Sequence, residues 1–409
     1  MSELIPLEQV RAAVLAAIEP LPPVETSRED AHGLVLAGEI TATEPVPPFA
    51  NTAMDGYAVR AADTDDASAD APVRLHVVDE LPAGRAPSTP VGAGQAIRIM
   101  TGAPIPEGAD AIVMVENTAP DGADGVLVRR AAAEGDHIRQ AGGDLTAGQA
   151  VFSPGVVLTA AHLGVLASLD IQKLRAHPRA RVGVLSTGDE LVAAGPLTPG
   201  KIRDSNRPML LALVQEAGAD AIDLGIAVDD EDLITRTIEH ALSTCDVVLT
   251  SGGVSVGDYD YVKAALDRLG HLEWRQVAIK PAKPLAFGII RGTPMFGLPG
   301  NPVSSLVSFE LFARPAILLR MGHRARFRRE VHAVAAHDFR RRRDGKLHLD
   351  RVVVEWRDGQ FVATSTGAQE SNVLSATAAA NALALIPDGD GVTAGDQITV
   401  MLLDGPADH

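Results

Sequence analysis

The sequence is poor in cysteine, in net positive charge and in long apolar runs, and each shortage excludes a class of protein. Cys245 is the only cysteine, so an intramolecular disulfide and a thiolate metal cage are excluded. It begins an apolar run, which favours a buried, unreactive thiol. The net charge of −17 argues against broad binding to nucleic acid or an anionic membrane.

No apolar run of the roughly 18 residues that a membrane span needs is evident. The first residues, MSELIPLEQV, lack the basic and apolar regions of a signal peptide. We therefore expect a soluble, cytoplasmic protein without nucleic-acid or membrane partners. Basic clusters at 324–330 and 340–346 are interpreted as a domain junction and a solvated hairpin.

With 409 residues, 46% of them apolar and 22% charged, the chain has room for several ordinary globular domains. Apolar spacing predicts an amphipathic helix over 7–19. Prolines break this pattern near residue 45. Short strands with Gly and Pro turns over 46–149 predict a β-rich domain.

From residue 180 strands alternate with helices up to the helix that begins at Pro302. This alternation predicts an α/β domain with a parallel sheet covered on both faces, whose ligands bind beyond the carboxyl ends of its strands. Beyond residue 325 the alternation stops. A hairpin signal at 357–359 and further strands predict a small all-β domain at the C-terminus.

Two strand–loop segments share one plan, TSGGVSVGDYDYVK (250–263) and RVGVLSTGDELV (181–192). Each ends a strand with Ser or Thr, then supplies glycine and two acids, which are Asp189 and Glu190 in one loop and Asp258 and Asp260 in the other. Helix capping would explain one carboxylate per loop. Two per loop favour Mg²⁺ or phosphate binding, because Mg²⁺ commonly uses one or two carboxylates and substrate phosphates.

A second constellation is AIKPAKPLAFG (278–288), in which Lys280 and Lys283 each precede a proline. The prolines keep the segment extended, so both ammonium groups can reach one locus. Two solvated lysines are the alternative, but the apolar flanks favour an anion site.

The next segment, FGLPGNPVSS (296–305), reads as a strand, a turn and a helix start. Asn301 is expected at the N-cap and Pro302 at the first helical position. A helix N-terminus favours an oxyanion, and Ser304 adds a hydroxyl. In PPFANTAMDGYAVR (47–60), Asp55-Gly56 by itself indicates only a turn.

Together these segments make the chain resemble the molybdopterin molybdenumtransferase (MoeA) family, bacterial relatives of the gephyrin E domain. The motifs occur in family order along nearly the whole chain. They are PPFANTAMDGYAV, MTGAPIPEGADAIVMVE, GGD (142–144), STGDEL, SGGVSVGDYDY, KPAKP and GLPGNPVS.

The resemblance implies an elongated homodimer of four-domain subunits. Their expected bounds are a discontinuous first domain (1–44 and 150–177), an inserted β-rich domain (45–149), an α/β molybdopterin-binding domain (178–322) and a C-terminal β-barrel (323–409). It also implies a reaction: molybdate is inserted into adenylylated molybdopterin with Mg²⁺-dependent release of AMP, which yields molybdenum cofactor. Transient handover from an adenylyltransferase and to apo-molybdoenzymes follows from such a role.

The resemblance implies site residues as well. Glu190 and Asp260 hold the metal and act in catalysis with Asp55, Thr101, Asp144, Lys280 and Lys283, the Asp55 group facing the α/β cleft of the other subunit. Substrate binding falls to Ser186, Thr187, Gly188, Ser251, Gly252, Gly253, Pro284, Pro299, Asn301, Pro302, Ser304, Arg351 and Ser371.

The sequence departs from the family pattern at GAQESNVLS (367–375), where Glu370 and Asn372 replace a more basic run. Ala50 and Thr52 also differ from the usual acidic and Ser residues. Two other functions fit the sequence less well. A non-catalytic scaffold would need an added interaction linker. A nucleotide hydrolase or adenylyltransferase built on the α/β domain would lack the N-terminal half.

Overall fold

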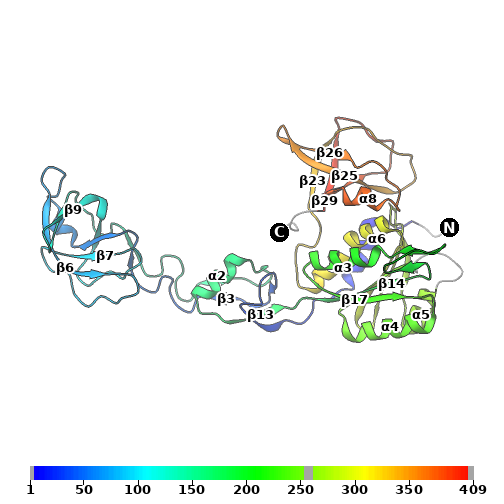
Figure 1. The fold of residues 1–409 in the computed structure, drawn as a ribbon, viewed down its shortest axis with the longest axis horizontal. Helices are drawn as coiled ribbons and strands as arrows, with labels where there is room; N and C mark the ends of the chain where they lie inside the picture. The colour runs from blue at the N-terminus through cyan, green and yellow to red at the C-terminus, as the bar shows by residue number, and fades with distance from the viewer. Residues whose placement is uncertain (1–3, 253–260, 404–409) are drawn as a thin grey trace.

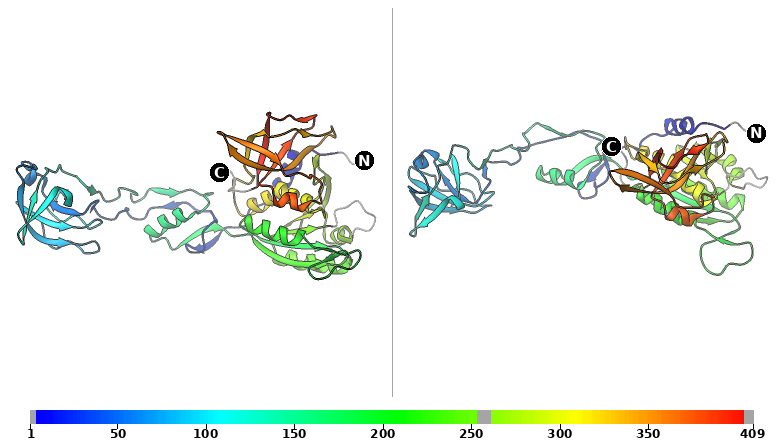
Figure 2. Two further views of the ribbon diagram at one scale, coloured as in Figure 1. Left: turned by 45° about the horizontal axis from the view of Figure 1, so that its top comes forward. Right: turned by 90° about the horizontal axis from the view of Figure 1, so that it is seen from above.

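A computed structural model describes residues 4–252 and 261–403. The molecule is elongated (Figure 1): a β-rich unit, drawn in blue and cyan, lies at one end, and a narrow middle part follows. The α/β unit and the C-terminal β unit stack on each other at the other end, and the further views in Figure 2 agree. The predicted Gly253, Asp258 and Asp260 lie outside the described residues.

The chain runs out through the narrow middle part and returns through it. β1 (Val24–Ser27) and β2 (Val35–Leu36) both pair with β13 (Lys173–His177), and β3 (Ile40–Thr41) pairs with β12 (Ala150–Phe152). α2 (Ala160–Ser168) packs beside them. The first helix, α1 (Leu7–Ala16), instead buries Val10 and Val14 in the core of the α/β unit.

In the sequence, the β-rich unit is inserted between these outgoing and returning segments. Its six strands pair in the order β8-β5-β7-β6-β10-β9. A small pair, β4 (Asn51–Thr52) with β11 (Ile138–Arg139), lies at its base. The six strands are β8 (Ala111–Met114), β5 (Gly56–Val59), β7 (Gln95–Ile99), β6 (Val73–Leu81), β10 (Gly125–Val128) and β9 (Thr118–Asp121).

The α/β unit contains a six-stranded sheet in the order β17-β14-β18-β22-β21-β19. The first four strands are parallel, as the sequence predicts, whereas β21 and β19 run antiparallel to their neighbours and depart from that expectation. The prediction that the sheet is covered on both faces is confirmed, because an apolar cluster lies on each face. The strands are β14 (Arg181–Thr187), β17 (Asp220–Ala227), β18 (Val247–Ser251), β19 (Glu273–Gln276), β21 (Pro284–Ile290) and β22 (Thr293–Leu298).

Helices supply the two covering layers. α3 (Asn206–Glu216) and α1 cover one face, and α4 (Glu231–Thr244) and α5 (Tyr261–Leu269) cover the other. The Asp230 carboxylate caps α4 by accepting a 2.7 Å bond from the Leu233 amide. Cys245 follows α4 and is buried, and this burial raises the pKa of its thiol, as expected for an unreactive cysteine.

A long helical stretch completes the first layer: α6 (Pro302–Ser308), a π-helical turn (Phe309–Ala313) and α7 (Arg314–Arg320). With 19 residues and a mean hydropathy of 1.3, it is the one helical stretch among the described residues that is long and apolar enough to cross a membrane. The sequence pattern did not reveal it as one continuous apolar run. However, 89% of that window is buried inside the protein. The core helix of a globular domain can be equally long and apolar.

The C-terminal unit is a closed barrel of five strands. β25 (Leu347–Arg357) pairs with both β26 (Gln360–Ser365) and β27 (Ala382–Ile386), and β23 (Glu330–Ala335) and β29 (Gln397–Leu402) complete the circle. The predicted turn between β25 and β26 is confirmed. Near its start β25 also pairs in parallel with β20 (Ile279–Lys280) of the α/β unit.

The interpretation of 340–346 as a solvated hairpin was wrong. β24 (Phe339–Arg340) pairs with β28 (Gly391–Val392), and the residues that follow form a loop. The Arg341 side chain is 1% exposed and forms ion pairs with Asp344 at 2.8 Å and Asp388 at 2.7 Å. It therefore holds this loop in place.

Candidate functional site

Two neighbouring parallel strands deliver the predicted loops to one edge of the sheet. Ser186 of β14 lies opposite Ser251 of β18, and Leu298 of β22 lies beside Ser251. Gly252 has φ +96°, and a Cβ there would lie 2.8 Å from the Thr187 carbonyl oxygen. Glycine is therefore required, because the two loops touch through their backbones.

A cavity of about 270 Å³ opens at this edge. The predicted residues Thr187, Glu190, Ser251, Gly252, Asn301 and Pro302 line it. Ser186 is fully buried beneath it, and Gly188 lies against the Glu190 carboxylate. The structure thus brings together those predicted residues of the two strand-end loops that it describes.

The two acids that follow β14 have different surroundings. Asp189 exchanges hydrogen bonds with Asp229: its Oδ1 accepts from the Asp229 amide at 3.1 Å, and its own amide donates to the Asp229 Oδ2 at 3.2 Å. Glu190 is exposed and lines the cavity. Capping explains neither acid, because β15 (Leu191–Val192) follows them and the next helix begins at Asn206.

Sequence reasoning missed two buried polar residues of this cavity, Asp204 and Asn206. The Asp204 Oδ1 accepts from the Ser186 hydroxyl at 3.1 Å. The Asn206 Nδ2 donates to the Ser251 Oγ at 2.7 Å and to the Gly300 carbonyl at 2.6 Å. Because an Asp-Ser-Asn run before an apolar helix is typical of an ordinary helix start, the sequence carries little signal for this role.

A larger cavity of about 700 Å³ shares Asn301 with the smaller one. It lies between the α/β unit and the barrel. Its lining includes the predicted Lys280, Lys283, Pro284, Pro299, Ser304 and Ser371. The sequence analysis assigned none of the remaining wall residues to a site, although it noted the basic cluster at 340–346 and Glu370. These loop and strand residues of the barrel are Arg340, Arg341, Arg342, Asp344, Lys346, His348, Asp350, Gln369 and Glu370.

The charge of the larger cavity is dominated by cations. Lys280 and Lys283 are exposed to it, and within the described residues neither ammonium group has an ion-pair partner. Both lysines line the same cavity, as expected. The expected extended backbone between them is not present, because the segment that joins β20 to β21 turns at a cis Lys280–Pro281 peptide and at Ala282, which has φ +70°. Two unpaired ammonium groups that face one cavity make it a candidate site for an anion.

Asn301 occupies the N-cap position of α6 and Pro302 the first helical position, as predicted. The Asn301 side chain does not cap the helix, however. Its Nδ2 donates to the Ser371 Oγ at 3.1 Å, and the Val303 amide donates to the Ser371 carbonyl at 3.2 Å. Ser371 of the C-terminal unit therefore occupies one of the free N–H groups of this helix start.

Arg351 is fully buried and is not part of the lining of either cavity. Its Nη2 donates to the carbonyls of Ala368 at 3.0 Å and Glu370 at 3.1 Å, and its Nε and Nη1 have no partner among the described residues. Burial lowers the pKa of its guanidinium. Arg351 thus supports the turn that carries Ser371 instead of reaching into the cavity.

Asp55, Thr101 and Asp144 lie in or beside the β-rich unit. That unit is at the opposite end of the molecule from the α/β and C-terminal units whose residues line both cavities (Figure 1). The Thr101 amide and hydroxyl both donate to the Asp55 Oδ1 at 2.7 Å. These bonds lower the pKa of Asp55. Asp144 is exposed in the loop after β11, where its amide donates to the Val46 carbonyl.

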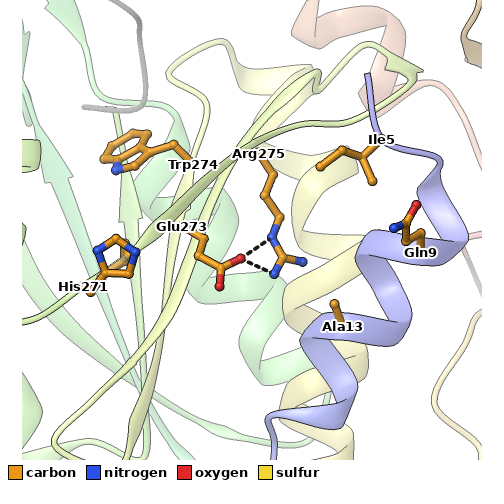
Figure 3. A pocket seen from close by; sticks show the side chains of 8 residues that line it. Ile5, Gln9, Ala13, His271, Glu273, Trp274 and Arg275 are labelled. Atoms are coloured by element: carbon orange, nitrogen blue, oxygen red, sulfur yellow. Dashed lines mark hydrogen bonds and ion pairs between the residues drawn. The ribbon is translucent and has the colours of Figure 1, made fainter. Parts of the chain in front are cut away.

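A further hollow, of about 550 Å³, lies between α1 and β19. Figure 3 shows Ile5, Gln9 and Ala13 on its α1 side and the Arg275–Glu273 ion pair on its strand side. It contains none of the predicted site residues. No group of three or more His, Cys, Asp and Glu residues that could hold a metal occurs in the described part of the chain.

Comparisons with known proteins match the whole architecture. Family models match three regions: "MoeA N-terminal region (domain I and II)" over 5–169, "Probable molybdopterin binding domain" over 183–318 and "MoeA C-terminal region (domain IV)" over 333–403. These matches outside the α/β region set aside an enzyme built on that region alone.

Individual relatives agree. Molybdopterin molybdenumtransferase 2 of Mycobacterium tuberculosis is 42% identical over 386 residues, which cover 92% of this chain and 94% of that protein. The Bacillus subtilis molybdopterin molybdenumtransferase is 35% identical over 92% of this chain and 88% of that protein. The crystal structure of a molybdopterin biosynthesis moeA protein from Pyrococcus horikoshii has a TM-score of 0.82 at 30% identity and covers 98% of this chain and all of that one. The chain therefore belongs to the MoeA family of molybdopterin molybdenumtransferases.

Proposed function

We propose that this chain inserts molybdate into adenylylated molybdopterin and releases AMP, which completes molybdenum cofactor. The observation that carries the proposal is the meeting of two cavities at Asn301. A small one is lined by hydroxyls, glycine backbone and a carboxylate, and a larger one by unpaired lysines. A reaction between an adenylylated pterin and an oxyanion needs two such sites side by side, because proximity supplies much of the rate.

The smaller cavity suits the phosphoanhydride of the adenylylated pterin. Thr187 and Ser251 offer hydroxyl groups at its wall, and Gly252 leaves room for the phosphates beside them. Hard oxygen donors fit Mg²⁺, and the exposed Glu190 carboxylate together with Asp260 would hold the ion against the phosphate oxygens. When bound, the ion would neutralise charge on the leaving AMP.

The larger cavity suits molybdate, a tetrahedral dianion. Lys280 and Lys283 supply the opposing charge, and Ser304 and Ser371 supply hydroxyls at the same wall. Charge-assisted hydrogen bonds contribute about 1.5–3 kcal/mol each, so two ammonium groups account for tight capture of a small anion.

The position of Asp55, Thr101 and Asp144 supports a homodimeric catalytic unit. Because these residues lie far from the cavities of their own chain, their participation requires the β-rich unit of one subunit to reach the cleft of the other. A C₂ dimer would build two equal clefts of this kind.

We also propose that the chain is divided into four domains. Their bounds are 1–44 with 150–177, 45–149, 178–322 and 323–409. The pairing of β1 and β2 with β13, and of β3 with β12, supports a discontinuous first domain. We place the enzyme in the cytoplasm, with transient handover from a molybdopterin adenylyltransferase and to apo-molybdoenzymes.

The test is incubation of the full chain with adenylylated molybdopterin, molybdate and Mg²⁺. We expect AMP release that depends on both molybdate and Mg²⁺, and reconstitution of an apo-molybdoenzyme by the product. AMP release without reconstitution would instead indicate a hydrolase, and failure of both would overturn the proposal.

A further inference from the structure

Three carboxylates line the larger cavity, those of Asp344, Asp350 and Glu370, and the proposed reaction assigns a role to none of them. Asp350 is the one on strand β25. The first residues of β25 pair in parallel with β20, so that Lys280 lies opposite His348. Side chains alternate along a strand, so His348 and Asp350 share a face. Both line the larger cavity, whereas Leu349 and Arg351 are fully buried on the other face.

Asp350 differs from the neighbouring carboxylate of the same cavity. Asp344 is ion-paired with Arg341 at 2.8 Å, with His348 at 3.2 Å and with Lys346 at 3.4 Å. Within the described residues, the Asp350 carboxylate has neither a hydrogen bond nor an ion pair. It is therefore a partly buried acid whose oxygen atoms are available to whatever fills the cavity.

The environment of Asp350 favours its neutral form. Burial raises the pKa of Asp350, and the cationic groups around it only partly oppose the increase. Those groups are His348, Arg351, Lys280 and Arg341. A dianion held by Lys280 would add a like charge to this environment and raise the pKa further, because a like charge disfavours an ionised carboxylate.

We propose that Asp350 binds the oxyanion as a neutral carboxylic acid, so that molybdate enters the larger cavity together with one proton. The protonated carboxyl donates a hydrogen bond to an oxyanion oxygen, whereas the ionised form would repel it. Asp350 is thus a further oxyanion-binding residue. This inference rests on the assignment of the larger cavity to molybdate.

Proton linkage gives this proposal a measurable signature. If Asp350 is ionised in the free enzyme and neutral in the complex, molybdate affinity falls by up to about tenfold for each unit of pH increase between the two pKa values. Titration calorimetry of the full chain with sodium molybdate, in two buffers of different ionisation enthalpy, counts the protons taken up. We expect up to one proton per molybdate, with the largest uptake at a pH between the two pKa values.

Three variants assign the proton. Asp350→Asn keeps a neutral hydrogen-bond donor of the same shape, so we expect retained molybdate binding, near-zero proton uptake and a flat pH profile. Glu370→Gln removes an exposed carboxylate from the same cavity and serves as the matched control, with uptake as in the wild type. His348→Gln removes the other titratable group on the same strand face and should also retain uptake.

Uptake that persists in Asp350→Asn, or that disappears in His348→Gln instead, would overturn the assignment to Asp350. So would molybdate binding by the wild type without proton uptake. Absence of molybdate binding by the wild type would remove the oxyanion site itself, which separates failure of the proposed function from failure of this inference.

Discussion

Asn301, at the start of α6, donates from its Nδ2 to the Ser371 Oγ at 3.1 Å, and so joins the α/β unit to the barrel where the two cavities meet. Asn301→Ala should raise the KM for molybdate about fivefold, because a neutral hydrogen bond contributes about 1 kcal/mol. Ser371→Ala should have a similar effect, and the double variant should lose little more than either. Fully additive losses would show that the two residues act independently.

Lys283→Ala should weaken molybdate binding about 10- to 150-fold, the loss of one charge-assisted contact of about 1.5–3 kcal/mol. Affinity for adenylylated molybdopterin should change little. Direct titration with each ligand measures the two affinities separately. Lys173→Ala, which removes a surface lysine paired with Glu25 at 2.8 Å, is the control and should leave both unchanged. Equal losses for both ligands would place Lys283 at the pyrophosphate.

Glu190→Gln should abolish or sharply weaken the Mg²⁺ dependence of AMP release, because it removes the exposed carboxylate of the smaller cavity. Asp189→Asn is the matched control on the adjacent residue. It weakens a hydrogen bond to the Asp229 amide, so we expect about 1 kcal/mol less stability and retained Mg²⁺ dependence. A Mg²⁺ titration of AMP release, with melting temperatures, distinguishes the two.

Asp258 and Asp260 lie outside the described residues, and their prediction rests on the sequence. Asp260→Asn should abolish Mg²⁺-dependent AMP release with the fold intact. Asp258→Ala should cost about 1 kcal/mol of stability, as loss of a helix cap does, and retain most activity. The reverse pattern would exchange their roles.

Mixed dimers test the shared cleft. An Asp55→Asn chain and an Asp260→Asn chain, each inactive as a homodimer, should together recover about a quarter to half of wild-type activity, because a heterodimer contains one intact cleft. Activity is measured on heterodimers purified with two different tags. Verified heterodimers without activity would contradict the arrangement.

Thr101 lowers the pKa of Asp55 through its amide first and its hydroxyl second. Thr101→Ala removes only the hydroxyl bond and keeps the amide bond, so it should raise this pKa part of the way towards the ordinary value, and Thr101→Ser should not. For a carboxylate with a depressed folded-state pKa, the associated stability is present at neutral pH and is lost as pH falls through that pKa. An NMR titration of the Asp55 carboxyl carbon measures both variants.

Much of the sheet edge of the α/β unit was predictable from the sequence. Each of its two central strands is a short apolar run, and the loop that follows begins with Ser or Thr and Gly. Ser186 and Ser251 lie at such strand ends, whereas the lysines of KPAKP stood out because a proline follows each of them. The antiparallel direction of β21 was missed, because an apolar strand pattern carries no information on direction. Its local sign is the short connection between β21 and β22.

Residues whose partners are distant in sequence were beyond local reasoning. Arg341 looked like part of a solvated basic run, but its side chain is buried and its guanidinium is paired with Asp388, 47 residues away. Arg351 and Asp350 are neighbours with opposite surroundings, since strand alternation sends one into the core and the other to the cavity. The register of β25 with β20 and β27 determines which of the two side chains faces the cavity.

The closed barrel has a consequence for the synthesis of the enzyme. The second wall of the larger cavity depends on β25, which is held in place by β27 and, through it, by β29 (Gln397–Leu402). The ribosome must therefore release β29 before an oxyanion can be enclosed. A nascent chain that ends after α7 carries both lysines but only one wall of the larger cavity, so the cavity forms only once the barrel strands have been synthesised.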